Sequence, residues 1–473
     1  MNLAHSQSQG YQRDGLGLVL LLLSSVLLGI WAVKNTIALR NIFLVIGAII
    51  GTLYSVRQYR EPSLKNALAL RSTVPLVMLG LMFLWVIFHY LFLSRYPQEQ
   101  LQELTSTWFR SLLAVLTAIG TAFAINKNKN LINWLWVGIL ASFFYLLCQY
   151  VPKAIAEHSL LAIDWYGYIF YGKINGVLAG SLMISGLTGS LLFYLVGSDR
   201  RRLIYASLLW VGGLLLAMYC YVFVFDARNG IGLTVLILMA ASVWFFIKLL
   251  SGRHSFKSPI SVKGLLVIAL AVISLVVWFG KAQSDRNPGW RTTIEDVKVA
   301  IQIDRYPNWR DPELLGYPKT IDGRQVVLNN YERTAWATAG LTLFAPENPL
   351  GIGVMSRSFP RLLKQKFGKD VDYIPSTHSA WVDFTLSYGF PGLVLLLMPL
   401  IMIVWGSLIS EVQDKLSGFR FVMGSALICM YTVGEISVQH GVEILMYWIA
   451  FLAVLHLLAK PSHGHLSPLV ANN

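Results

Sequence analysis

Long apolar runs separated by polar loops dominate this chain. Each run is about 18 to 21 residues long, the length that a helix needs to cross about 30 Å of hydrocarbon. We therefore predict twelve membrane-spanning helices. They occupy residues 15–33, 37–56, 75–94, 108–125, 131–151, 176–196, 203–224, 230–250, 260–280, 391–410, 418–436 and 442–459.

One polar segment is much longer than every other loop and divides the chain into three parts. Residues 1–280 contain nine predicted spans, residues 281–390 form the polar segment, and residues 391–473 contain the last three spans and a short tail. A transporter made of two six-span repeats more often has its main loop in the middle of the chain. The position of this segment therefore counts against that architecture.

Composition supports a membrane protein. The 473 residues are 55% hydrophobic and 13% charged, whereas soluble domains carry about 25% charged residues. The net charge of +14 can indicate nucleic-acid binding, but the basic residues lie mainly in short loops between apolar runs. That distribution encodes membrane orientation, so we expect an all-α polytopic protein in a lipid bilayer and no nucleic-acid partner.

The basic loops predict the orientation. Clusters such as 200–202 and 248–263 lie on one side, whereas the short loops opposite carry mostly single basic residues. The richer side should be cytoplasmic, which places both termini inside and the polar segment outside. We expect the first run to be a retained span, because no small-residue cleavage site follows it. The three cysteines lie in apolar runs, so no disulfide framework is expected.

His378 is the first candidate for chemistry, because a short helix is predicted to begin there. Ser376 or Thr377 can serve as the N-cap of that helix. Gly389 and Pro391 should end it. In the first helical turn the positive end of the dipole disfavours imidazolium, which leaves the neutral base that proton abstraction requires. The alternative is a histidine that only hydrogen-bonds a loop carbonyl.

Arg228 is the second candidate, in the Asp226-Ala227-Arg228-Asn229-Gly230 link between two apolar runs. With almost no loop there, the guanidinium must lie at or just below the outer membrane surface. A charge at that depth is costly unless it finds a partner. Asp226 is one such partner, in which case the pair is structural. An anionic ligand is the other, because the planar fork of donors suits phosphate oxygens.

Two further arginines lie in the polar segment. Arg333 begins an apolar pattern that contains Trp336 and predicts a helix of about three turns. Arg291 follows Trp290 in a less informative context. The alternative for both arginines is that they simply face water. Other ionisable residues near the outer surface that can line a cavity there are Asp383, Glu435, His440 and Glu443.

The order and spacing of four motifs resemble the O-antigen ligase and polymerase superfamily. The motifs are Arg228-Asn229-Gly230, Arg333-x-x-Trp336, Pro349-Leu350-Gly351-x-Gly353, and His378-Ser379 followed by Gly389 and Gly392. The last is similar to the family's His-(Asn/Ser)…Gly-x-x-Gly signature. Lys173-Ile174-Asn175-Gly176 resembles a further segment of the family more weakly. Twelve spans with one large late loop fit the same family.

This resemblance implies a GT-C-like glycosyltransferase at the periplasmic face of the bacterial inner membrane. Its donor would be a glycan on undecaprenyl pyrophosphate, and its acceptor lipid A–core in lipopolysaccharide biosynthesis, with no metal or other cofactor. Arg228 and Arg333 would stabilise the departing pyrophosphate, and His378 would deprotonate the acceptor in an inverting displacement. Residues expected to assist pyrophosphate binding are Arg291, Asn229 and Trp336.

Other activities stay open. An O-antigen polymerase would use another lipid-linked glycan as acceptor, and a protein O-oligosaccharyltransferase would use a protein hydroxyl. The single large loop and the motif order favour the ligase over the polymerase, and the short segment after the last span counts against the protein-modifying branch. Outside the family, a lipid-glycan flippase or exporter would use the same arginines to bind its cargo without reacting.

Overall fold

The structure, a computed structural model, describes residues 14–60, 70–159, 169–197, 199–250, 274, 277–282, 284–285, 289–368, 374, 376–410, 414–434 and 440–459. Within these ranges the chain forms helices and two isolated β-bridges, but no extended strand. Nine of the described helices are long and apolar enough to cross a membrane. Fold and composition together define a polytopic α-helical membrane protein.

Most predicted spans coincide with helices. The long apolar helices are Ile37–Tyr59 (α2), Leu70–Phe92 (α4), Pro97–Lys127 (α5, a π-helical turn and α6), Lys129–Ala156 (a 3-10 helix and α7), Lys173–Leu195 (α8), Arg200–Val224 (α9 and a π-helical turn), Arg228–Leu250 (α10), Ala380–Ile409 (α17) and His440–Leu457 (α19). Two shorter apolar helices are Gly15–Ile30 (α1) and Ser417–Val433 (α18). These helices account for every predicted span except 260–280, which lies largely outside the described residues.

Within the long apolar helices, the boundaries of the named elements are as follows: Pro97–Glu103 (α5), Leu104–Trp108 (π), Phe109–Lys127 (α6), Lys129–Trp136 (3-10), Val137–Ala156 (α7), Arg200–Tyr219 (α9) and Cys220–Val224 (π).

Helices α8 and α19 form the centre of the bundle, because 94% of the apolar window of each is buried by the rest of the protein. In α2 and α4 only 33% and 28% of the corresponding window is buried, as expected of lipid-facing helices.

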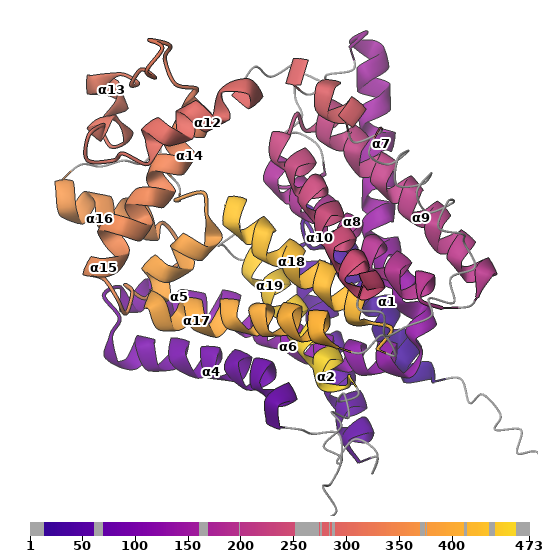
Figure 1. Ribbon diagram of the computed structural model, residues 1–473. Coiled ribbons are helices and arrows are strands. Elements are labelled where there is room, and N and C mark those ends of the chain that lie inside the picture. Colours follow the sequence, from indigo (N-terminus) through magenta and orange to yellow (C-terminus); the bar gives the residue numbers. More distant parts are fainter. Residues whose placement is uncertain are drawn as a thin grey trace, which may run out of the picture.

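The polar segment folds around a hydrophobic core of its own, which includes Trp309, Trp336 and Phe359. Its helices are Gly289–Ala300 (α12), Pro307–Trp309 (3-10), Pro312–Leu315 (α13), Leu328–Ala339 (α14), Gly340–Phe344 (π), Ala345–Glu347 (α15) and Ser358–Phe367 (α16). Figure 1 shows α12, α13, α14 and α16 grouped on one side of the molecule, apart from α7 and α9. The prediction that a helix starts near Arg333 is wrong, because α14 begins at Leu328 and Arg333 lies in its second turn.

Helix α17 contains the predicted break. The sequence indicates a short helix ended by Gly389 and Pro391 and a separate span from 391, and Ala380–Ile409 consists of two helices that meet at a kink at Gly389, whose backbone (φ 70°, ψ −175°) is not helical. Pro391 has no N–H, so it cannot donate to the preceding turn. The freed carbonyls of Leu386 and Ser387 accept instead from the N–H groups of Ile352 and Gly353, at 3.0 and 2.8 Å.

The backbone at the kink and the Pro349–Gly353 turn therefore pack closely against each other. Gly389 has φ 70°, and a Cβ there would lie 2.3 Å from the carbonyl oxygen of Pro349. Gly351 has φ 86°, and a Cβ there would lie 2.4 Å from the Ser387 carbonyl oxygen. Glycine is thus required at both positions by backbone conformation and by close approach. The contact fixes the first half of α17, and with it the segment that carries His378, against the polar segment.

Candidate functional site

A cavity of about 690 Å³ lies where the polar segment meets the ends of the membrane helices. We call it the arginine cavity. Residues from α8, the link before α10, α12, α14, the start of α17 and the end of α18 line it. The lining residues include Lys173, Asp226, Arg228, Asn229, Trp290, Thr293, Asn330, Arg333, Thr334, His378 and Thr432. A cavity of this size is typical of small-molecule and cofactor sites.

The link that leads to Arg228, the first residue of α10, follows the π-helical turn Cys220–Val224. Asp226 reverses the chain in a left-handed conformation (φ 45°), which aspartate tolerates better than most residues. Gly176 of α8 lets the ring of Phe225 approach, since a Cβ there would lie 2.5 Å from that ring. Tight packing of α8 against the link therefore places Lys173 and Arg228 on walls of the same cavity.

Arg333 reaches the arginine cavity from α14 and is close enough to Arg228 for the two positive charges to repel. Among the described residues neither guanidinium forms an ion pair or a hydrogen bond. Asp226 is the one carboxylate among the described lining residues, against three cations when Lys173 is included. The cavity therefore has a net positive charge and suits an anionic ligand.

His378 lies on the wall next to Arg333, but not in a helix. The prediction that it occupies the first helical turn is wrong: Ser379 is the N-cap, α17 starts at Ala380, and His378 precedes both with a left-handed φ of 59°. Its imidazole stacks on the indole of Trp336, with ring centroids 5.4 Å apart and an interplanar angle of 16°. Trp336 is buried and donates to the carbonyl of Trp309 at 3.0 Å, so the ring behind His378 is itself held in place.

Asp383 explains why the chain turns at His378. Its carboxylate is buried and accepts from the N–H of Thr377 at 3.0 Å and from the Thr377 hydroxyl at 2.7 Å. The N–H of His378 donates to the hydroxyl of Ser376 at 3.1 Å. These bonds close a compact turn just before α17. Asp383 was predicted only as a general cavity residue; the structure gives it the more specific contact with Thr377.

Glu332, next to Arg333 in α14, is a charged neighbour of His378. The Tyr317 hydroxyl donates to its carboxylate at 2.7 Å. Burial raises the pKa of the Glu332 carboxyl, while the Tyr317 hydrogen bond and the nearby His378 and Arg333 oppose that rise. The negative charge of Glu332 thus acts on His378 from outside the lining of the cavity.

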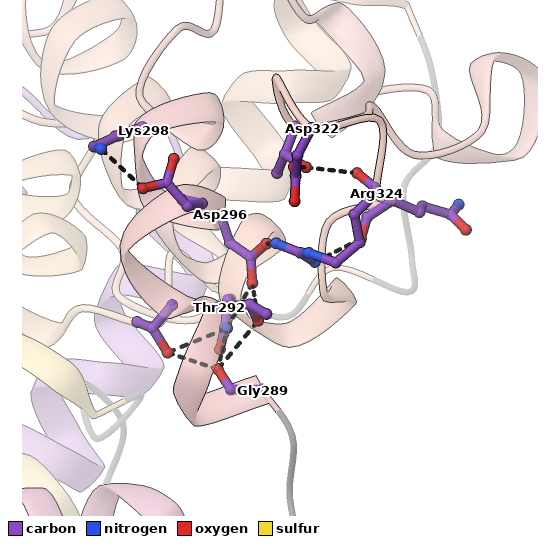
Figure 2. A network of polar contacts seen from close by, with 11 residues as sticks. Gly289, Thr292, Asp296, Lys298, Asp322 and Arg324 are labelled. Carbon is purple, nitrogen blue, oxygen red and sulfur yellow. Dashed lines mark hydrogen bonds and ion pairs between the residues drawn. The ribbon is translucent and has the colours of Figure 1, made fainter.

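A buried carboxylate holds α12 against α14. Asp296 is fully buried and accepts from Arg324 at 2.7 Å, from Thr292 at 3.1 Å and from the amide of Asn330 at 2.9 Å. Figure 2 shows Asp296 between Thr292 and Arg324. Asn330 also donates to the carbonyl of Gly289 at 3.0 Å, which ties the start of α12 to α14. The network positions the wall of the arginine cavity that contains Trp290 and Thr293.

The structure brings most of the predicted site residues together. Arg228, Asn229, Arg333 and His378 line the arginine cavity, and Trp336 lies directly behind His378. Arg291 belongs to the first turn of α12, but its side chain lies outside what the structure describes. Glu435 also lies outside the described residues.

Two other candidates are engaged elsewhere. His440 hydrogen-bonds Asn175 at 2.6 Å and stacks on Tyr171. The carboxylate of Glu443 accepts from Arg110 at 2.6 Å and from the Trp31 indole at 2.7 Å, so it joins helices rather than lining the arginine cavity.

Sequence reasoning missed a row of uncharged polar residues on α14. Asn330, Thr334 and Thr338 are four residues apart, so they share the face of the helix that lines the arginine cavity with Arg333. Trp290 and Thr293 of α12 lie on the same wall. The four-residue spacing was visible in the sequence, but Asn and Thr at that spacing are common on solvated helices, so the pattern gains meaning only from the cavity.

Comparison with known proteins adds no assignment: no protein-family model matches this chain, and no curated protein matches it.

Proposed function

We propose that this protein is a glycosyltransferase that moves a glycan from undecaprenyl pyrophosphate to a hydroxyl of lipid A–core, the O-antigen ligase reaction, at the periplasmic face of the inner membrane. The observation that carries the proposal is the meeting of Arg228, Arg333 and His378 in one cavity beside the ends of membrane helices. Twelve spans and a GT-C-like arrangement are part of the same proposal.

The proposed reaction is a single displacement. The acceptor oxygen forms a bond to the anomeric carbon while the bond from that carbon to the phosphate oxygen breaks, which inverts the anomeric configuration. His378 takes the proton of the acceptor hydroxyl. Arg228 and Arg333 stabilise the charge that grows on the departing pyrophosphate, and Lys173 adds a third cation to the same cavity.

Several contacts support these roles. The stack on Trp336 and the turn held by Asp383 restrict the His378 ring to one place on the cavity wall. Thr334 and Thr338 offer hydroxyl groups of the kind that hydrogen-bond sugar hydroxyls.

Reconstitution tests the proposal. Full-length protein in liposomes would be given lipid-linked glycan together with lipid A–core, a second lipid-linked glycan or a protein acceptor, and each acceptor would be examined for a gain in mass. Transfer to lipid A–core, also in the presence of EDTA, is the expected result. Transfer to either other acceptor would redirect the proposal to the polymerase or the protein-modifying reaction, and strict dependence on a divalent metal would contradict the role given to the arginines.

A matched pair of histidine variants separates an enzyme from an exporter. His378→Ala should lower transfer by about two to four orders of magnitude while lipid-linked donor accumulates. His158→Ala is the control, because His158 is exposed, also has a left-handed φ (49°) and lies outside the arginine cavity. Undiminished glycan flux in a His378→Ala strain would contradict the enzymatic proposal and favour a flippase or exporter.

A further inference from the structure

A second polar cavity, of about 580 Å³, is rimmed by the sequence Asn126-Lys127-Asn128-Lys129-Asn130. All five residues line it, as the chain passes from the last turn of α6 into the 3-10 helix Lys129–Trp136. Lys415 and Leu416, just before α18, form part of the opposite wall. We call this the lysine cavity. The proposed transfer reaction makes no use of it.

Among the described residues that line it, the lysine cavity has three lysines and Arg420 against one carboxylate, Asp414. Arg420 lines it but forms a buried ion pair with Asp414, so these two charges cancel. Lys127 has one acidic neighbour, Asp14, at 3.6 Å. Lys129 and Lys415 add two more ammonium groups. Amide groups of Asn126, Asn128 and Asn130 alternate with the lysines and supply hydrogen-bond donors beside the charges.

The lysine cavity lies at a membrane surface, because the residues that line it are at the ends of membrane helices. Helix α8 contributes Lys173 near its start to the arginine cavity and Phe193 near its end to the lysine cavity. At 1.5 Å per residue these positions are about 30 Å apart, the thickness of a bilayer core. Helix α18 runs between the same two cavities, from Leu416 to Thr432. The two cavities therefore open at opposite surfaces of the membrane.

We propose that the lysine cavity binds the phosphate headgroup of an anionic glycerophospholipid. Lysines at headgroup depth attract phosphodiester anions, and basic pockets between membrane helices are suited to such headgroups. The apolar side chains of Phe193, Leu455 and Leu458 in the same cavity give a surface for the glycerol end of the acyl chains. A soluble phosphate compound would use the lysines but gain nothing from that apolar surface.

Native mass spectrometry of the full-length protein tests the proposal. Protein purified in a neutral detergent would be titrated with phosphatidylglycerol, phosphatidylcholine or inorganic phosphate. A saturable phosphatidylglycerol adduct is expected, with little phosphatidylcholine binding. In the variant Lys127→Gln/Lys129→Gln/Lys415→Gln the apparent affinity for phosphatidylglycerol should fall about tenfold or more. The corresponding triple Lys→Arg variant should retain it.

The matched control removes three cations from the same end of the helices but outside the lysine cavity. Arg60, Arg200 and Arg201 are exposed there, so Arg60→Gln/Arg200→Gln/Arg201→Gln should bind phosphatidylglycerol like the native chain. Equal losses in both triple variants would show diffuse surface attraction and overturn the proposal. So would full competition by inorganic phosphate at matched concentration. If the lysine triple variant does not fold, Lys415→Gln alone, which changes one exposed loop residue, should still lower the affinity measurably.

Discussion

The arginines of the arginine cavity and Arg110 inside the helical bundle differ in how their charges are compensated. Arg110 donates to the fully buried carboxylate of Glu443 at 2.6 Å, and the Trp31 indole donates to the same carboxylate. Arg228 and Arg333 form no ion pair or hydrogen bond within the described part of the chain, and both line a cavity of about 690 Å³.

The comparison distinguishes an arginine that stabilises the fold from arginines whose charge is available to a ligand. A charge at the edge of the hydrocarbon region is costly, so it persists where a partner compensates it. Glu443 is that partner for Arg110, and the result is a clamp between α6 and α19. Asp226 is close enough to favour the charge of Arg228, but the described residues form no ion pair with Arg228 or Arg333, so a ligand is the natural source of further negative charge. Loss of the Arg110–Glu443 pair should therefore lower the stability of the fold, whereas loss of Arg228 or Arg333 should lower activity.

The largest effect is expected from breaking the bundle clamp. Glu443→Leu leaves the Arg110 charge buried without its carboxylate and removes the acceptor of the Trp31 indole. The free energy of unfolding should fall by about 3–5 kcal/mol, measured by denaturant unfolding in detergent micelles. Glu157→Leu, at an exposed position after α7, is the control and should have little effect. A loss under about 1 kcal/mol for Glu443→Leu would show that the ion pair is not a structural clamp.

Substitution of Arg333 should lower activity with little change in stability. Arg333→Ala removes one of the two guanidinium groups from the arginine cavity and should lower the rate of the proposed glycan transfer by about 10²- to 10³-fold. Its unfolding free energy should change by less than about 1 kcal/mol, because no described ion pair is broken. Arg305→Ala is the control, since Arg305 is an exposed arginine of the same polar segment. Full transfer activity in Arg333→Ala would remove Arg333 from the mechanism.

The sequence was most informative where local rules decide the outcome. Apolar run length located most of the membrane helices, and basic residues at the ends of runs singled out Arg228. His378 and Arg333 share a cavity although 45 positions separate them in the sequence, and only the resemblance to a family connected them beforehand. That Glu443 pairs with Arg110 rather than lining the cavity was not predictable, because the partners lie 333 residues apart in the sequence.

Where prediction failed, a nonlocal contact overrode a local signal. Ser376 and Thr377 looked like helix caps, yet Asp383 accepts from Thr377 and closes a turn, so α17 begins three residues later than Thr377. The helix end predicted at Gly389 and Pro391 is confirmed, since the Gly389 backbone leaves the helical conformation. That the Pro349–Gly353 turn satisfies the backbone groups freed at this break was not predictable from the local sequence.

A moderate effect is expected from loosening the turn that holds His378. Asp383→Ala removes the acceptor of two Thr377 donors, which should cost about 1–3 kcal/mol of stability and lower kcat of the proposed transfer about tenfold with a smaller change in KM. Asp383→Asn keeps one acceptor oxygen and should restore most of the activity. This rescue is the distinguishing measurement. If Asp383→Asn and Asp383→Ala lose kcat equally at equal folded fraction, Asp383 does not act by positioning the turn.

The smallest effect concerns the carboxyl beside His378. Burial raises the pKa of Glu332 despite the Tyr317 hydrogen bond, so the folded protein holds this proton to higher pH than the unfolded chain does. The free energy of unfolding should therefore fall as pH rises above about 4.3, the ordinary glutamate pKa. Glu332→Gln removes the titrating group and should show a smaller fall. Denaturant unfolding at a series of pH values would measure the difference. Glu295→Gln, which removes an exposed carboxylate paired with Lys298, should keep the fall seen in the native chain. An equal pH dependence in Glu332→Gln and the native chain would mean that burial does not raise the Glu332 pKa.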